Sequence, residues 1–167
     1  QESVVLMKKS ADQNDDLAEN TVGYFFSEGI AAEKDEKLGF EFYLRSAKRG
    51  FSVAQTNVSW CYSEGKGVDK NEEEAVRWCF LAATQGYSSA QSSLSFKFFK
   101  GKGTRMDEEE AMRWMEESSN RGDVDGMVFV GKRCFHGQML KRDRVRSMEL
   151  FERAALQGSN AATRQLA

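Results

Sequence analysis

The sequence predicts an all-α fold, a solenoid of antiparallel helix pairs built on a 36-residue repeat, and three observations predict it. Glycine recurs with this period in two columns: Gly29, Gly65, Gly101 and Gly137, and Gly50, Gly86, Gly122 and Gly158. Small and large hydrophobic side chains recur with the same period, and no insertion or deletion interrupts it. The 167 residues contain no proline, so no helix interior is broken.

Residues 54–64 illustrate the first helix of each period. Their apolar side chains are Ala54, Val58, Cys61 and Tyr62. A spacing of four, three and one places these side chains on one face of a helix. We expect Gly65 to end the helix, because glycine adopts the left-handed conformation without strain.

The second helix of each period is predicted to begin at a capping residue. The capping column is Asp35, Asn71, Asp107 and Asp143. Each of these side chains can accept a hydrogen bond from the free N–H groups of the first turn. Asn71 with Glu74, and Asp107 with Glu110, also have the spacing of a capping box. In the second repeat the helix continues through Ala75, Trp78, Cys79, Ala82 and Ala83, and Gly86 closes it.

The whole chain, residues 1–167, is interpreted as a single array of about four and a half repeats. We expect repeats at 18–53, 54–89, 90–125 and 126–161. Residues 1–17 are expected to hold the second helix of a preceding partial repeat, and residues 162–167 to begin a further repeat. Further repeats or domains are therefore expected in the full-length chain.

Composition bears on several classes of function. The formal net charge is −2, which argues against dedicated nucleic-acid binding, and no apolar run reaches the ~18 residues needed for membrane insertion. Cys61, Cys79 and Cys134 lack zinc-ligand spacing, and the chain has one histidine. We therefore expect no metal, no cofactor, no catalytic residue and no enzyme activity. The thiols are expected to be buried and free in the cytoplasm or another reducing compartment, although a Cys61–Cys79 bridge remains open.

One stretch of the second repeat resembles a known family. From Ala54 to Gly86 it reads AQTNVSWCYSEGKGVDKNEEEAVRWCFLAATQG. The Ala-Gln start, the loop Gly65-x-Gly67 and the pair Ala82-Ala83 resemble the Sel1-like repeat (SLR) family, relatives of the tetratricopeptide solenoids. The resemblance covers essentially the whole chain, although Ala31 and Met139 replace the second loop glycine of the first and fourth repeats.

The resemblance implies a right-handed superhelix that acts as an adaptor or scaffold, with first helices lining its concave face. Such a face suits a peptide or helix of a partner protein. One column of the first helices reads Tyr24, Trp60, Phe96 and Lys132, and its neighbour reads Phe25, Cys61, Lys97 and Arg133. From these columns the partner-binding candidates are Tyr24, Trp60, Phe96, Lys97, Lys132 and Arg133. The alternative is that the aromatic residues belong to the core between repeats.

Two other functions stay open. The chain could be a regulatory repeat segment of a larger enzyme or complex, whose catalytic domain lies elsewhere. It could also be a nucleic-acid-binding helical repeat, because residues 132–146 are rich in lysine and arginine and residues 96–100 alternate aromatic and basic side chains. The acidic run at 107–110 is expected to complement the dipole of a helix start.

Overall fold

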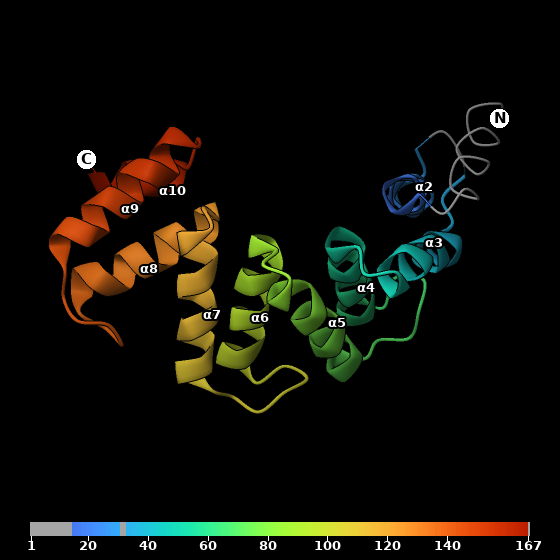
Figure 1. Cartoon of the computed structure of the whole chain (residues 1–167), viewed down its shortest axis with the longest axis horizontal. Helices are drawn as coiled ribbons and strands as arrows, with labels where there is room; N and C mark the ends of the chain where they lie inside the picture. Colours follow the sequence, from blue (N-terminus) through green and yellow to red (C-terminus); the bar gives the residue numbers. More distant parts are fainter. Residues whose placement is uncertain (1–14, 31–32, 167) are drawn as a thin grey trace. The chain divides into compact units, whose positions relative to one another are not determined.

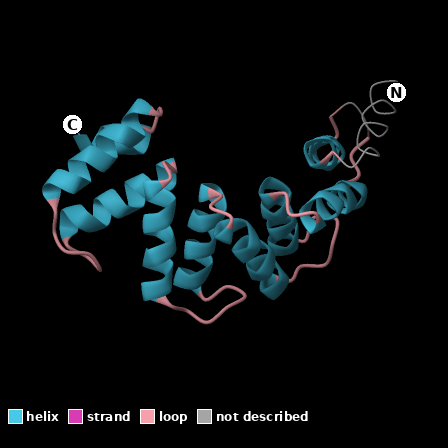
Figure 2. Ribbon diagram, viewed as in Figure 1, coloured by secondary structure: helices cyan, strands magenta, loops and turns pink. Residues whose placement is uncertain are grey.

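The computed structural model describes residues 15–30 and 33–166, and every regular element in these ranges is an α-helix (Figures 1 and 2). The prediction of an all-α fold is confirmed. Helices α2 to α9 contain 13 residues each, which is a length of ~20 Å. The expected second helix of a preceding partial repeat lies outside the described residues except at 15–17.

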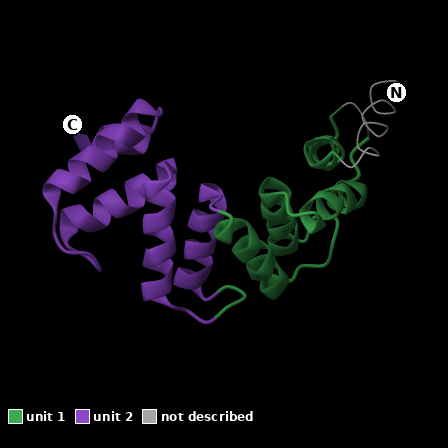
Figure 3. Ribbon diagram, viewed as in Figure 1, with its two compact units in different colours: residues 1–85, 102–104 green, residues 86–101, 105–167 purple. Residues whose placement is uncertain are grey.

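The chain forms two compact units, which are shown in different colours in Figure 3. Unit 1 comprises residues 1–85 and 102–104. Its described helices are α2 (Asp16–Glu28), α3 (Glu36–Lys48), α4 (Ser52–Glu64) and α5 (Glu72–Thr84). Its core includes two clusters: Phe40, Tyr43, Ala47, Ala54, Val58 and Cys61 in one, and Val22, Phe26 and Phe42 in the other.

Unit 2 comprises residues 86–101 and 105–167. Its helices are α6 (Ser88–Lys100), α7 (Glu108–Asn120), α8 (Val124–His136), α9 (Arg144–Leu156) and α10 (Asn160–Leu166). Its core includes a cluster of Met115, Met127, Val128, Val130, Cys134, Leu150, Phe151, Ala154 and Ala162.

The predicted capping column starts all four second helices. Each capping side chain accepts hydrogen bonds from backbone N–H groups of the first turn: Asp35 from Leu38, Asn71 from Glu73 and Glu74, Asp107 from Glu110, and Asp143 from Arg146. The capping box is only half formed, because the N–H of Asn71 donates to Tyr62 O at 2.9 Å. The side chain of Glu74 accepts instead from Arg77 Nη1, at 2.5 Å.

The two helices of each pair meet at a column of small residues. In the second repeat the hydroxyl of Ser59 donates to the carbonyl oxygen of Ala75, at 2.7 Å. In the third repeat Ser95 donates to Ala111 in the same way, at 2.6 Å. Each bond joins a first helix to its partner in the buried interior, so it fixes both the distance and the register of the pair.

In the first and fourth repeats, other small residues occupy the positions where the paired helices meet. In the fourth repeat the serine lies on the second helix, and Ser147 donates to Gly131 O at 2.9 Å. In the first repeat both positions are glycine, and a Cβ on Gly39 would lie 2.8 Å from Gly23 O. Every repeat therefore keeps small residues at these two positions, and in the first and fourth repeats the glycine of the first helix makes room for the ring of Tyr43 or Phe151.

In the second and third repeats, a second loop glycine packs the loop against the preceding repeat. Gly67 has φ of +70°, and a Cβ placed there would lie 2.0 Å from the carbonyl oxygen of Glu36. Gly103 has φ of +68° and the same 2.0 Å relation to Glu72 O. Only glycine allows the loop to pack this closely against the first turn of the preceding second helix.

The three cysteines are buried and free, as expected. Burial raises the pKa of the Cys61 thiol from 9.0 to about 12. Burial likewise raises the pKa of Tyr43 from 10.0 to about 12. Both groups are therefore protonated and unreactive at neutral pH in the folded protein.

We predict that Gly67→Ala destabilises unit 1 more than Gly50→Ala does. Both glycines have positive φ, but a Cβ on Gly50 would meet nothing within 4 Å. Gly50→Ala should therefore cost only the left-handed strain, about 1 kcal/mol, whereas Gly67→Ala should cost about 2–4 kcal/mol because the loop must also move. Urea denaturation measures both values, and equal losses would show that the loop does not depend on this close approach.

We also predict that the free energy of unfolding falls as the pH rises from 9 to 12. In this range the unfolded chain releases the protons of Cys61 and Tyr43 while the folded chain retains them. At pH 10.5 these two groups together should remove about 2–3 kcal/mol relative to pH 8. Denaturation at both pH values is compared with Cys61→Ala, which should show a smaller loss between them. An identical pH dependence in the variant would contradict the assignment to this thiol.

Candidate functional site

The aromatic candidates of unit 1 lie on first helices and are partly exposed. Tyr24 on α2 is 49% exposed and Trp60 on α4 is 45% exposed. The Tyr24 ring contacts Phe25, with 6.2 Å between ring centroids. Neither candidate is enclosed in the core of unit 1, so both rings offer apolar surface to solvent.

Trp60 borders a small cavity of about 210 Å³ that also contains charged groups. Glu36 at the start of α3 forms ion pairs there with Lys34, at 2.7 Å, and with Lys66 from the following loop, at 3.1 Å. The hydrogen bonds from these two ammonium groups lower the pKa of the Glu36 carboxyl. The cavity thus pairs an aromatic wall with a satisfied ion cluster.

In unit 2 the structure brings two candidates together around a third residue. Phe96 on α6 is 40% exposed and packs edge-on against Phe129 of α8, with 6.0 Å between centroids. Phe99 lies 5.3 Å from the same ring. The guanidinium carbon of Arg133 lies 4.9 Å from the Phe129 centroid, within the range of a cation–π interaction. We call Phe96, Phe99, Phe129 and Arg133 the aromatic–cation cluster.

Phe129 is the residue that the sequence analysis missed. Its column otherwise holds Thr21, Asn57 and Ser93. One aromatic side chain in a polar column is a signal that comparison of the repeats could have found. Its ring links the first helices of the third and fourth repeats.

The remaining candidates differ in exposure. Lys132 on α8 is exposed, and Lys97 on α6 is half-buried. Cys61, in the same column as Lys97, is only 1% exposed and belongs to the core. The neighbouring column is therefore part of the interior in unit 1 and carries charge at the surface in unit 2.

Some side chains of the two charged runs form contacts within their own unit. In the basic run, Arg146 forms an ion pair with Glu116 at 2.9 Å, and Arg144 lies over the Phe135 ring at 5.5 Å. In the acidic run at the start of α7, Glu110 accepts from Arg113 at 2.6 Å and from Trp114 Nε1 at 2.8 Å. The helix start favours this acidic run, as predicted.

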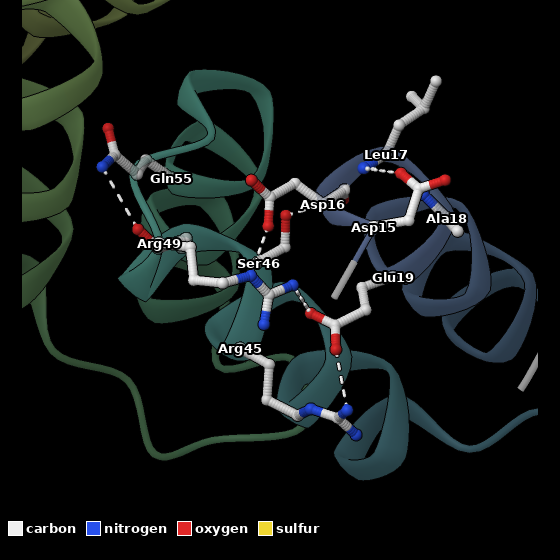
Figure 4. Close-up of polar contacts among 10 residues, drawn as sticks. Asp15, Asp16, Leu17, Ala18, Glu19, Arg45, Ser46, Arg49 and Gln55 are labelled. Atoms are coloured by element: carbon white, nitrogen blue, oxygen red, sulfur yellow. Dashed lines mark hydrogen bonds and ion pairs between the residues drawn. The ribbon is translucent and has the colours of Figure 1, made fainter. Parts of the chain in front are cut away.

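A buried carboxylate is the strongest electrostatic feature of unit 1 (Figure 4). Glu19 of α2 is fully buried and faces two arginines of α3. Arg49 donates to one oxygen and also pairs with Asp16, and Arg45 Nη2 lies 2.7 Å from the other oxygen. Hydrogen bonds from Arg49 to Glu19 and Asp16 raise the pKa of the guanidinium.

The same place in the second repeat holds two amides. Gln55 replaces Glu19 and Gln85 replaces Arg49, and Gln85 Nε2 donates to Gln55 Oε1 at 2.7 Å. Gln55 in turn donates to Ala47 O at 3.2 Å. Glu19 thus occupies a structural position that an amide fills elsewhere. Its Oε2 accepts a hydrogen bond from Arg49, whereas its Oε1 is in an ion pair with Arg45 and accepts no hydrogen bond from any described residue.

The described residues contain no cluster of histidine, cysteine and acidic side chains that could hold a metal ion. His136 ends α8 and packs against Phe135, with 5.1 Å between centroids. Between residues 15 and 166, apart from 31 and 32, no helix combines the length and apolarity needed to cross a bilayer.

Comparison with protein families matches the Sel1 repeat to four consecutive segments, residues 17–51, 52–87, 88–123 and 124–159. None of the curated protein sequences matches the chain.

Solved structures of Sel1-like repeat proteins superpose on nearly the whole chain. A Sel1 repeat protein from Oxalobacter formigenes has 28% identity and a TM-score of 0.91, over 96% of this chain and 46% of that one. A protective antigen of uropathogenic Escherichia coli with an SLR fold has 28% identity and a TM-score of 0.88, over 98% of this chain and 35% of that one. This chain therefore spans less than half the length of either protein.

A more distant structure supports the fold alone. Cysteine rich protein B of Helicobacter pylori has 17% identity and a TM-score of 0.58, over 72% of this chain and 91% of that one.

The two versions of the buried pair yield a prediction. Glu19→Gln should destabilise unit 1 by about 1–3 kcal/mol, because Arg45 and Arg49 would then face an amide. Glu19→Gln combined with Arg49→Gln reproduces the pair of the second repeat and should recover much of that loss. Urea denaturation of the two single variants and the double variant measures the coupling, and strictly additive effects would contradict it.

Proposed function

Because the chain belongs to the Sel1 repeat family, we propose that it is a protein–protein interaction scaffold that binds a partner segment on the exposed face of its first helices. Sel1 repeats generally serve as interaction scaffolds rather than enzymes. The proposed role is accordingly non-catalytic, with Tyr24 and Trp60 contributing in unit 1 and Phe96, Lys97, Lys132 and Arg133 in unit 2.

The aromatic–cation cluster of unit 2 carries this proposal. Aromatic and arginine side chains dominate the binding energy of protein interfaces, because they bury much area with few rotatable bonds. Phe96 and Arg133 are held by their contacts with Phe129, so little conformational freedom would be lost when a partner binds. Their exposure leaves that surface available.

The charges beside this cluster indicate the chemistry of the partner segment. Lys97 follows Phe96 on α6, and Lys132 and Arg133 lie on α8 with Phe129, so both helices that carry the rings also carry positive side chains. A peptide or helix with acidic residues beside one or two apolar side chains would complement these positive side chains. Such a segment would place its apolar side chains on Phe96 and Phe129.

The test is an affinity capture with matched variants of the chain. The bait Phe96→Ala/Lys132→Glu should lose a partner that the wild-type bait retains, and the purified partner should then bind this variant at least tenfold more weakly in calorimetry. A second bait, Tyr24→Ala/Trp60→Ala, tests whether a partner binds through the first helices of unit 1. Circular dichroism and melting establish that each bait is folded.

The control bait is Leu156→Ala/Arg153→Glu, which makes the same kinds of change on α9. Leu156 is 88% exposed, and Arg153 is exposed as well. A partner that is lost equally from the control, or from none of the baits, would refute binding through the first helices.

A further inference from the structure

The loop of the fourth repeat lacks the glycine that holds the corresponding loops in place. Met139 occupies the column of Gly67 and Gly103. It has φ of +60° and is the one residue other than glycine with positive φ in the described ranges. In the loops of the second and third repeats, a Cβ in this position would lie 2.0 Å from a carbonyl oxygen of the preceding second helix. Met139 has such a Cβ, so its loop cannot pack against the start of α7 in the same way.

A groove lies at this position in unit 2. It has a volume of about 790 Å³ and lies between the first turns of α7 and residues 139–140. Met112, Met139 and Leu140 supply apolar surface. The acidic side chains that line it are Asp107, Glu108, Glu109, Glu110 and Glu116.

Two of the glutamates that line the groove have no positive partner. Glu110 pairs with Arg113 and Glu116 pairs with Arg146. Glu108 and Glu109 form no ion pair with any described residue. The groove is therefore negative as well as apolar.

The equivalent glutamate of unit 1, Glu36, pairs with ammonium groups. Glu36 occupies in α3 the position of Glu108 in α7, and it binds the ammonium groups of Lys34 and Lys66 at 2.7 and 3.1 Å. In the sequence, Met106 and Gln138 stand where these two lysines would be relative to Glu108. Both intramolecular cations are thus replaced by neutral side chains at a loop that also lacks its glycine.

We propose that this groove is a docking site for a basic segment of a partner protein. A lysine or arginine of that segment pairs with Glu108 and Glu109, in the place that Lys66 takes beside Glu36. An adjacent aliphatic side chain packs on Met112, Met139 and Leu140. The negative groove repels nucleic-acid phosphates. It uses none of the first-helix candidates, so it is a second surface and does not rest on the first one.

The test is fluorescence anisotropy with labelled, capped hexapeptides as probes. The first probe alternates lysine and leucine, the second replaces leucine with serine, and the third replaces lysine with glutamate. We expect the lysine–leucine probe to bind at least tenfold more tightly than either of the others, and less tightly as salt rises. Amide chemical shifts should change around residues 107–116 and 138–140.

The decisive variant is Gln138→Lys/Met139→Gly, which restores the lysine and glycine found in the second repeat. It should bind the lysine–leucine probe at least tenfold more weakly than wild type, while melting at the same or a higher temperature. Loss of binding without loss of stability separates docking from misfolding. Gln165→Lys on α10, an exposed position with the same charge change, should bind as wild type does.

Four results would overturn the proposal. Two concern the probe directly: wild type does not bind the lysine–leucine probe at millimolar concentration, or Gln138→Lys/Met139→Gly binds it as wild type does. The other two are displacement of the probe by spermine at equal concentration, and self-association of the wild-type chain that Gln138→Lys/Met139→Gly abolishes. The first-helix variant Phe96→Ala/Lys132→Glu should retain probe binding, so the two proposals fail independently.

Discussion

A side chain larger than serine at the contact between paired helices would push them apart, and the other features depend on their being close. The hydroxyls of Ser59 and Ser95 each donate a hydrogen bond to a carbonyl oxygen of the facing helix. This bond satisfies a buried hydroxyl group and joins the two helices. Helices held at this distance allow core residues such as Leu94 and Met115 to be fully buried. They also leave the opposite sides of the first helices for larger, exposed side chains.

The exchange between serine and glycine in this column shows why the repeat tolerates sequence drift. In the fourth repeat the hydroxyl moves from the first helix to the second, yet a side chain-to-carbonyl bond still joins Ser147 and Gly131. In the first repeat the two glycines make room for neighbouring side chains, because a Cβ on Gly39 would lie 2.2 Å from Ser27 Oγ and a Cβ on Gly23 would lie 2.8 Å from the Tyr43 ring. The constraint is on combined size, not on the identity of either residue.

The repeat could be predicted from sequence because its strongest constraints are local. Left-handed glycines and capping side chains act within one turn, so their columns give the ends of the helices directly. The start of a first helix has no such column, and α4 begins at Ser52, two residues before the position suggested by its apolar pattern. The Glu19 ion pairs and the role of Phe129 could not be derived in this way. They depend on residues about thirty positions apart or on an exception within one column. The groove at Met139 was equally hidden, because the missing glycine shows its effect only against the helix of another repeat.

The loop glycines also bear on how cooperatively such an array unfolds. In a linear repeat, stability is the sum of each repeat's own contribution and its coupling to immediate neighbours. Gly67 couples adjacent repeats through backbone atoms, and this coupling survives most changes of side chain. Met139 removes it between the third and fourth repeats, where side-chain contacts such as Arg146 with Glu116 must serve instead. The fourth repeat therefore lacks this backbone coupling to the third, and its amide hydrogens should exchange through local opening before those of the third.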